Sequence, residues 1–555
     1  MSNSPNLKVN LTNNNVDVSV PLNGVTAVLA RTTKGPQNDP SIIINSISQF
    51  NRVYGSEIVP DGTVSNIEKA LSLGSTLRIC RVLSSSATYG TVGSSLENGL
   101  FTLSDEAGKK AGFYLRTKYK GMVIGTGGTG INFQAYLSGS DVMYKVVEGD
   151  TTLDSGRVFS YATKPDSNFV DYQAISNFFT SNTYFEPVFL TTAGFTITSL
   201  GSLLKWLKEL DQNSNGYLTV NYNGKALTTS PANLAVTQGE SGTAPTLDDW
   251  EQAFVSLLDY NDMYQVIASH VNQHLKTEAS KFHAYVKNYA EDLQEWIYYI
   301  ECPKENDTKD KMIAWVNTTS STVGKSKFIA YFGGGIKYYD NPGILQDCDV
   351  LGSVVGLGDN SAINYGPYRS FAGMNRGTLP DALGPVCPNY GSPSRYDDLN
   401  DLAHVNLNMI VVKDTRSSGK VTMLWHNFTS QVKQDSFRFI SNVRLVLYMK
   451  KQFRPIIESY FEEPNIWGTW KRIYLEVKPI IDELVTDNAI TDPEWLGDQD
   501  ATSWSDLQVN TEADARQGRY HVIFKFKDVA TMQEVTLDLV VDKATQTSSV
   551  TINND

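Results

Sequence analysis

The segment between residues 237 and 333 constrains the fold most, because strand and helix patterns alternate along it. Runs rich in β-branched and aromatic residues predict strands, and amphipathic stretches predict the helices between them. The predicted strands are residues 263–268, 296–302 and 328–333, and the predicted helices are residues 271–288 and 307–320. A further helix should begin after Thr246, whose hydroxyl can cap the first amides. Strands that alternate with helices usually pair in parallel, so we expect a largely parallel α/β sheet here.

The N-terminal region predicts the beginning of an α/β core. A turn at Gly35-Pro36 and a short helix that packs Phe50 and Tyr54 follow the first buried strand. The expected elements are a strand at 25–30, a helix at 66–73 and a strand at 77–82.

The composition shifts to Ser, Gly and Thr at residues 84–95, which indicates a linker. From about residue 90 to residue 230 the pattern is rich in strands, with two helical stretches. The expected strands are 113–119, 132–137 and 142–147, and the expected helices lie near 171–179 and 202–210. We therefore expect a β-rich domain inserted into the α/β core.

The last third of the chain predicts two helical runs, at 437–449 and 466–484. An acidic link at 491–507 should follow, and then strands at 519–526 and 534–541. In the first of these strands Tyr520, Val522, Phe524 and Phe526 share one face.

Both ends of the chain carry candidate strands. Val16, Val18 and Val20 alternate on one face near the start, and Val535, Leu537 and Leu539 do so near the end. An unpaired strand edge is an aggregation hazard in a monomer, but it offers main-chain hydrogen bonds to a neighbour's strand. We expect these two sets of residues to be the principal subunit-interaction sites.

Charge and cysteine usage exclude several classes of protein. The 60 acidic residues outnumber 47 Lys and Arg, and the net charge of −13 argues against nucleic acid or an anionic membrane as partner. The N-terminus has no signal-peptide pattern, and no apolar run is long enough to anchor the chain in a membrane. Four separated cysteines without a CxxC pair are expected to be buried thiols in a reducing compartment: Cys80, Cys302, Cys348 and Cys387.

Two local motifs imitate ligand-binding loops. Residues 125–130 satisfy G-x-G-x-x-G, but a strand follows where a dinucleotide site needs a helix, which favours a turn. Asp211, Asn213, Asn215 and Gly216 match the opening of a calcium loop, but Tyr222 stands where a bidentate Glu is needed. A hairpin turn is favoured there too.

Histidine and serine patterns give no catalytic centre. His270 and His274 are four residues apart, with His283 farther along, but no third ligand is placed for zinc. We expect exposed or core histidines. Neither G-x-S-x-G nor a Cys-His signature occurs. The sequence predicts no enzyme activity, no metal and no cofactor.

Five cations stand out on the two C-terminal helical runs: Lys450, Lys451, Arg454, Lys471 and Arg472. They could form a solvated helix face that balances Glu458, Glu462 and Glu463. Alternatively, they could form a patch that meets an acidic partner surface.

Several segments together resemble contractile tail sheath proteins of bacteriophages. The similarity covers about residues 24–89 and 237–484, and its most specific pieces are V-V-G-L at 354–357, G-P-Y at 366–368, F-A-G at 371–373 and F-E-E-P-N at 461–465. Residues 399–411 resemble a strand entry of the family. The usual sheath pattern has Trp where this chain has Tyr368 and Pro where it has Phe371.

The resemblance implies a multidomain α/β (α+β) fold. A discontinuous sheath core from N- and C-terminal segments would carry an inserted β-rich, barrel-like domain, a second α/β domain and extended terminal strand arms. The expected boundaries are an N-terminal arm at 1–23, a first core segment at 24–88, the inserted domain at 89–235, an α/β middle domain at 236–395, a C-terminal core domain at 396–529 and a C-terminal strand and arm at 530–555.

The resemblance also implies a structural role in a phage tail, assembled in the bacterial cytoplasm. Stacked hexameric rings of identical subunits would surround a tail tube in a metastable state and contract to drive the tube through the host envelope. The expected partners are the tail tube protein, which the five cations would face, baseplate proteins, and tail terminator or neck proteins.

Three other classes of protein remain as alternatives. A contractile bacteriocin or injection-system sheath would share every feature above. A type VI secretion sheath is disfavoured, because its unit is divided between two chains and this chain is expected to be complete. A carbohydrate-binding or hydrolytic tail component would need an aromatic-lined pocket with two convergent carboxylates, and the sequence nominates no such pair.

Overall fold

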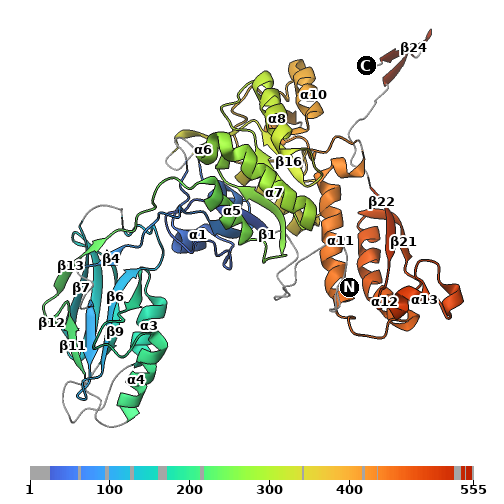
Figure 1. Ribbon diagram of the computed structural model, residues 1–555. Helices are drawn as coiled ribbons and strands as arrows, with labels where there is room; N and C mark the ends of the chain where they lie inside the picture. The colour runs from blue at the N-terminus through green and yellow to red at the C-terminus, as the bar shows by residue number, and fades with distance from the viewer. Residues whose placement is uncertain are drawn as a thin grey trace.

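The computed structural model describes residues 25–59, 64–93, 99–125, 130–160, 172–212, 218–339, 343–415, 419–433, 435–529, 539–543 and 546–552. Figure 1 shows a central sheet flanked by helices, a β-rich region at one end and a C-terminal region built on two long helices. The N-terminal valines Val16, Val18 and Val20 and the C-terminal Val535 and Leu537 lie outside the described residues.

A single sheet of eight strands forms the centre of the molecule, in the order β2-β3-β1-β14-β15-β16-β19-β20. The six strands from β3 to β19 run parallel, while the short β2 and the edge strand β20 pair antiparallel. The strands are β1 (Val25–Ala30), β2 (Ile43–Ile44), β3 (Thr76–Arg81), β14 (Met263–Ala268), β15 (Ile297–Glu301), β16 (Ile329–Gly333), β19 (Leu407–Thr415) and β20 (Gly419–Leu424). The predicted parallel sheet is confirmed.

We expected a second α/β domain beside the core, and the strand order contradicts this. Strand β1 lies between β3 and β14, so the N-terminal segment and the middle segment share one sheet. Local periodicity identifies each strand but carries no information about a partner more than 200 residues away.

Helices cover both faces of this sheet (Figure 1). They are α1 (Ile47–Tyr54), α2 (Asn66–Ser72), α5 (Leu247–Val255), α6 (Val271–Leu275), α7 (Ala279–Leu293), α8 (Lys309–Val323), α9 (Leu351–Tyr365) and α10 (Tyr396–His404). A capping box between Thr246 and Asp249 begins α5 as predicted. The single helix expected at 271–288 is interrupted near Lys276, whose φ of 52° is incompatible with a continuous helix. A hairpin of β17 (Ile336–Tyr339) and β18 (Leu345–Cys348) precedes α9.

Helix α9 approaches its neighbours closely because it carries glycines. A Cβ at Gly352 would lie 2.3 Å from the carbonyl oxygen of Asn66, and a Cβ at Gly356 would lie 2.5 Å from the Cβ of Leu73. These two glycines are four residues apart and share one helix face, so any larger residue would push α9 away from α2. The glycine of the V-V-G-L segment, on which part of the resemblance rests, therefore allows α9 to pack closely against α2.

A buried polar network joins four elements around Asp359 of α9. The hydroxyl of Thr26 on β1 donates to both carboxylate oxygens, at 3.1 and 2.9 Å, and the Gln265 amide on β14 donates at 2.7 Å. Arg444, on the C-terminal helix α11 (Ile440–Glu458), donates to the carbonyl of Gly358 at 3.1 Å. Asp359 is fully buried. The network thus ties the N-terminal strand, the middle segment and the C-terminal region together.

The inserted domain is a ten-stranded, mostly antiparallel sheet in the order β12-β11-β5-β6-β4-β13-β7-β8-β9, with β10 paired to β6. Its strands are β4 (Thr91–Val92), β5 (Phe101–Ser104), β6 (Lys110–Thr117), β7 (Ile131–Ser138), β8 (Asp141–Glu148), β9 (Thr151–Ser160), β10 (Phe185–Phe189), β11 (Thr219–Tyr222), β12 (Lys225–Ala226) and β13 (Ala232–Thr237). Helices α3 (Tyr172–Ser181) and α4 (Leu200–Gln212) pack beside it. The β-rich insertion is confirmed, but the expected barrel is not, because β12 and β9 do not pair within the described ranges.

Arg81, at the end of β3, connects the inserted domain to the core. Its side chain is fully buried and donates to the carbonyls of Thr32 and Gly35 in the core, at 3.1 and 3.0 Å. It also donates to the carbonyl of Lys120 in the inserted domain at 2.7 Å. One guanidinium can span both because its donors point outward in a fixed planar fork.

The C-terminal region packs a two-stranded sheet on two long helices (Figure 1). Its elements are α11, α12 (Trp467–Thr486), β21 (Ile490–Leu496), α13 (Glu512–Arg516) and β22 (Ile523–Asp528). The predicted apolar face of Tyr520, Val522, Phe524 and Phe526 packs against these helices.

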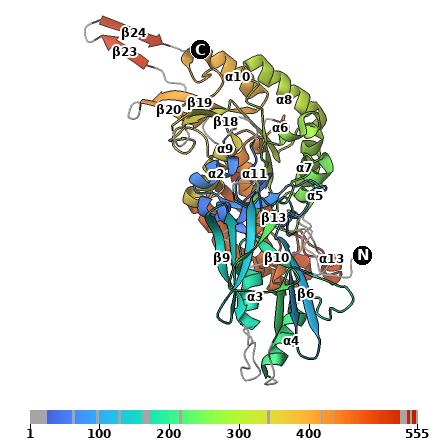
Figure 2. The same cartoon turned by 90° about the vertical axis from the view of Figure 1, so that its left-hand side faces the viewer.

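The expected acidic link at 491–507 is partly wrong, because its first residues belong to β21. Pro493 and the irregular register between Thr491 and Glu494 interrupt the alternation from which a strand is predicted. Beyond β22, the last described residues form the hairpin β23 (Leu539–Lys543) and β24 (Gln546–Ile552), which stands away from the rest of the chain (Figure 2). Leu539, a predicted interaction residue, begins β23.

Asp359→Asn should remove some of the pH dependence of stability. Burial raises the pKa of Asp359 to about 7, so the folded protein keeps a proton that the unfolded chain loses near pH 4. Stability contributed by this proton is present at low pH and is lost as the pH rises through about 7, with a slope of up to roughly 1.4 kcal/mol per pH unit. We expect the free energy of unfolding, measured with urea at several pH values between 5 and 8, to depend less steeply on pH in the variant than in the wild type.

The exposed Asp310 on α8 provides the control. Asp310→Asn should keep the wild-type slope. Parallel slopes for Asp359→Asn and wild type would contradict the assignment.

Candidate functional site

Three of the five predicted tube-facing cations converge on one buried carboxylate. Lys450, Lys451 and Arg454 of α11 surround Glu295, which immediately precedes Trp296 and β15. The ammonium nitrogens of Lys450 and Lys451 lie 3.4 and 3.1 Å from its carboxylate oxygens, and Arg454 donates to the same group. The four side chains are only 4–9% exposed.

Main-chain carbonyls complete this cluster. Lys450 donates to the carbonyls of Leu293 and Gln294 at the end of α7, at 2.9 and 2.6 Å, and Lys451 donates to the carbonyl of Asn261. A cation at a helix C-terminus also interacts favourably with the helix dipole. The cluster therefore fixes α11 against the central sheet.

The pKa values reflect burial among like charges. Burial lowers the pKa of Lys450 to about 7, although Glu295 opposes the shift, and burial likewise lowers the pKa of Lys451. For Glu295 burial acts in the opposite direction, but Lys451, Lys450 and Arg454 together lower its pKa. Glu295 therefore stays ionised and compensates the buried cations.

The other two predicted cations lie on the surface of α12. Lys471 is 56% exposed and 3.7 Å from Asp500, and Arg472 is 55% exposed and 3.6 Å from Glu463. The five cations therefore do not form one patch, which corrects the sequence interpretation. The alternative interpretation, a solvated helix face on which acidic residues balance the cations, applies only to Lys471 and Arg472. Nothing in the sequence near residue 450 indicates Glu295 as the partner.

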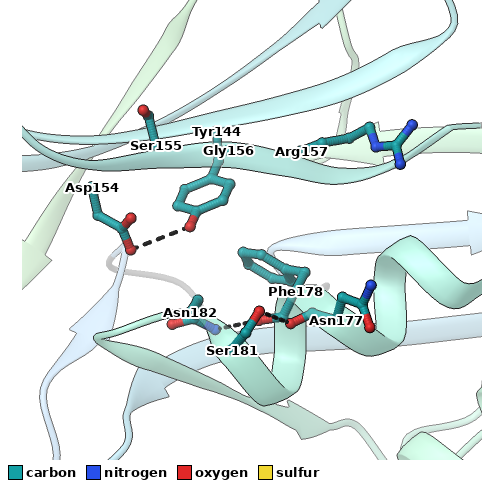
Figure 3. Close-up of a pocket in the computed structure, with 9 residues that line it drawn as sticks. All are labelled: Tyr144, Asp154, Ser155, Gly156, Arg157, Asn177, Phe178, Ser181 and Asn182. Atoms are coloured by element: carbon teal, nitrogen blue, oxygen red, sulfur yellow. Dashed lines mark hydrogen bonds between the residues drawn. The ribbon is translucent and has the colours of Figure 1, made fainter.

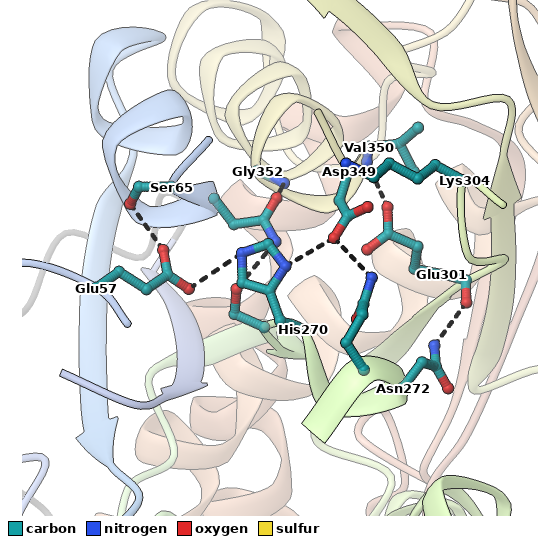
Figure 4. Close-up of polar contacts among 12 residues, drawn as sticks. Glu57, Ser65, His270, Asn272, Glu301, Lys304, Asp349, Val350 and Gly352 are labelled. Atoms are coloured by element: carbon teal, nitrogen blue, oxygen red, sulfur yellow. Dashed lines mark hydrogen bonds and ion pairs between the residues drawn. The ribbon is translucent and has the colours of Figure 1, made fainter. Parts of the chain in front are cut away.

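A second buried polar cluster lies at the carboxyl ends of the central strands (Figure 4). His270, which follows β14, is 2.6 Å from Asp349 through Nδ1 and 3.7 Å from Glu57 through Nε2. Glu57 accepts a hydrogen bond from Ser65 at 2.7 Å. Glu301, at the end of β15, accepts one from the amide of Val350. Sequence reasoning missed this cluster, since its members are distant along the chain.

Burial and charge oppose each other in this cluster. Burial disfavours the imidazolium of His270, but Asp349 and Glu57 outweigh it and raise the pKa of that ring. Burial, followed by the charge of Asp349, raises the pKa of Glu301 well above its ordinary value. Ligand sites of α/β sheets often lie at these strand ends. Here the His270, Glu57 and Asp349 side chains are at most 1% exposed, and their contacts join the N-terminal segment to β14 and to the start of α9.

The three predicted histidines have separate partners. His274 lies 3.4 Å from a guanidinium nitrogen of Arg31, and His283 contacts Tyr298 and Asn272 at 2.8 and 3.0 Å. Across the described ranges, no three His, Cys, Asp or Glu residues are arranged to hold a metal ion.

The imitation calcium loop is only partly described. Asp211 lies in the last turn of α4, and Asn213, Asn215 and Gly216 lie outside the described residues. Tyr222 is buried on β11, and its hydroxyl donates to the carbonyl of Phe133 at 3.2 Å. The residue at the position of the expected calcium ligand is therefore a core residue. In the glycine motif, residues 126–129 are also outside the described ranges, and β7 follows as predicted.

A hollow of about 300 Å³ opens between β8, β9 and α3 (Figure 3). Tyr144, Phe178 and Asp154 contribute to its lining, and the Tyr144 hydroxyl donates to Asp154 at 3.2 Å. Asp154 is the one carboxylate among its lining residues. The pair of carboxylates that glycoside hydrolysis requires is therefore not provided by this hollow.

All four cysteines, Cys80, Cys302, Cys348 and Cys387, are buried and free, as predicted. In the portion of the chain that the structure describes, no helix has the length and apolar character needed to cross a membrane.

Comparisons with known proteins rest on structure alone. No protein-family model matches the sequence, and no curated protein matches it. The sheath tail protein from Desulfitobacterium hafniense is similar in structure at 11% identity and a TM-score of 0.50, with 93% of this chain and 100% of that chain covered. A sheath tail protein from Listeria innocua is similar at 12% identity and a TM-score of 0.51, with 91% and 95% covered.

The chain therefore has the fold of the sheath tail proteins. The resemblance inferred from the sequence is confirmed at the level of the fold, along nearly the whole of both chains.

Glu295→Gln should destabilise the contact between α11 and the central sheet. Three buried cations would lose the carboxylate that they share, and such a loss typically costs on the order of 3–5 kcal/mol. We expect a lower urea midpoint and faster hydrogen exchange in α11.

Glu463→Gln removes an exposed partner of Arg472 and serves as the matched control, with an expected change below about 1 kcal/mol. Equal effects of the two substitutions would refute the role of the buried cluster.

Proposed function

We propose that this chain is the structural sheath subunit of a contractile phage tail. The observation that carries the proposal is the fold shared with two sheath tail proteins over more than 90% of each chain. In this role the subunits polymerise as stacked hexameric rings around a tail tube, and the chain performs no catalysis.

Strand exchange between neighbouring copies is the proposed means of assembly. The sheet of β21 and β22 has two strands in the described portion of the chain, and each has an outer edge without a strand partner there. A two-stranded sheet is only marginally stable by itself, so added strands would stabilise it. The strands proposed to be added are the terminal arms, with Val16, Val18 and Val20 in one and Val535, Leu537 and Leu539 in the other.

The outer face of this sheet favours a specific partner over general aggregation. Lys525 and Lys527 of β22 are exposed and lie 3.6 and 2.7 Å from Glu494 and Asp492. Charged side chains on an edge strand discourage pairing with arbitrary strands. Pairing of a neighbour's arm with this sheet must therefore be stabilised by apolar contacts and by the high local concentration of the arm.

Contraction would move subunits as rigid bodies while these strands stay paired. The buried clusters around Asp359 and Glu295 and the Arg81 junction support such rigidity, because each joins segments distant in the chain. The extended tail would be a trapped state of higher energy that relaxes when a baseplate releases it. No bound nucleotide is required for this step.

The tail tube protein, the baseplate and a terminator or neck protein are the proposed partners in the virion. Lys471 and Arg472 are the predicted cations that remain on the surface, so they are the candidates to face an acidic tube wall. Lys450, Lys451 and Arg454 are buried around Glu295, so we no longer propose that they face the tube.

Replacing the apolar face of the N-terminal arm should abolish assembly. The triple variant Val16→Ser, Val18→Ser and Val20→Ser, like deletion of residues 1–20, should yield folded monomers and no tubes by negative-stain electron microscopy. The loss of three apolar contacts per arm weakens every subunit interface at once.

Asn13→Ser, Asn14→Ser and Asn15→Ser provide a control of equal size in the same segment and should assemble normally. Long tubes from the valine variant or from the truncation would refute strand exchange by this arm.

A further inference from the structure

A pocket of about 130 Å³ lies where the C-terminal region meets the segment after α9. Its lining includes Arg369, Arg376, Ser441, Asn442 and Asn488. The first two follow the G-P-Y turn, the next two begin α11, and Asn488 follows α12. Val529, which also lines it, immediately follows β22. The pocket therefore lies between the segment that follows the G-P-Y turn and the residue that follows β22.

The polar lining contains two guanidiniums, hydroxyls and side-chain amides, and it contains no carboxylate. Arg369 and Arg376 are half-buried, and neither forms an ion pair with any described residue. Arg369 donates to the carbonyl of Asp487, and Arg376 donates through Nε to the carbonyl of Ser370 at 2.6 Å. These single bonds orient the guanidiniums and leave other donors of each group available, since a guanidinium carries five.

The N-terminus of α11 adds a second source of positive potential. This helix has 19 residues, and Phe439 at its N-cap supplies no side-chain hydrogen bond to the first turn. The first amides of a helix attract anions through the helix dipole.

A buried hydroxyl at this helix terminus has no partner. Ser441 lines the pocket, is only 3% exposed, and its Oγ finds no hydrogen-bond partner among the described residues. A buried polar group without a partner costs free energy and calls for an explanation, such as a ligand.

Two aspartates near the pocket are already engaged elsewhere. Asp487 accepts the hydroxyl of Tyr368 at 2.5 Å, and Asp528 accepts the amide of Asn442 at 2.6 Å and the hydroxyl of Ser436 at 2.8 Å. Neither belongs to the pocket lining. They fix the surrounding groups, and they do not neutralise the two guanidiniums by direct pairing.

We propose that this pocket is an oxyanion-binding site that accepts one carboxylate or phosphate group. Arginine matches the planar geometry of such groups, the Ser441 hydroxyl supplies a further donor, and the dipole of α11 favours negative charge. The volume corresponds to roughly four water molecules, which suits a single carboxylate or phosphate and is too small to enclose a whole nucleotide. The anion comes either from solution, as inorganic phosphate, or from an acidic side chain of a second copy of this chain.

Thermal unfolding of the full-length monomer with increasing inorganic phosphate, at constant ionic strength, tests the site. Phosphate should raise the melting temperature, because a ligand that binds the folded state stabilises it. The double variant Arg369→Gln, Arg376→Gln should bind phosphate at least about tenfold more weakly, a loss typical of charge-assisted bonds. Ser441→Ala, which leaves the guanidiniums in place, should weaken binding by a smaller factor.

Lys471→Gln, Arg472→Gln is the matched control, because it removes two exposed cations outside the pocket. It should leave phosphate binding unchanged. No phosphate-dependent stabilisation of the wild-type monomer, or equal phosphate responses of the two double variants, would overturn the proposal.

The source of the anion is distinguished in assembled protein. If the pocket takes a carboxylate of a second copy, assembly should be weakened by phosphate and by the pocket variants, and the polymer should no longer bind phosphate. If phosphate is the natural ligand, the polymer should bind it as the monomer does. The phosphate response of the monomer tests the site even if the chain forms no sheath.

Discussion

The pairing of β1 with both β3 and β14 is the constraint on which the rest of the structure depends. This strand occupies an inner position of the central sheet, although more than 200 residues separate it from β14. Thr26 of β1 also donates to Asp359, which brings α9 and the C-terminal helix α11 into the same core. An inner strand cannot be lost without leaving two neighbouring strands unpaired, so the N-terminal segment holds the discontinuous core together.

Buried charged residues define the junctions between regions of this molecule. Arg81 fixes the inserted domain, the Glu295 cluster fixes α11, and His270 with Asp349 and Glu57 fixes the N-terminal segment. Such groups add little net stability compared with apolar packing, but removing one partner is costly. They therefore disfavour alternative arrangements of the regions. In the proposed sheath role, the subunit would need its regions to keep one arrangement, and these junctions would serve that need.

Local patterns in the sequence were sufficient to predict most strands and helices of the core. Periodicity identified β1 and β14–β16, and the capping residue Thr246 identified the start of α5. The sequence could not show that the N-terminal and middle strands share one sheet, because strand pairing over long separations leaves no local signal. Strand β21 was missed because Pro493 and its acidic neighbours are typical of a link.

Burial of the cations on α11 was also beyond prediction from sequence. Lys and Arg are usually exposed, and the compensating Glu295 is distant in the chain. The arms remain predictions, because Val16 to Val20 and Val535 to Leu537 lie outside the described residues. The measurement that tests the account most directly is a cryo-electron-microscopic helical reconstruction of the assembled chain. The account predicts a hollow tube of six-subunit rings in which strands from neighbouring copies extend the β21–β22 sheet. Subunits that meet without strand addition at this sheet would contradict it.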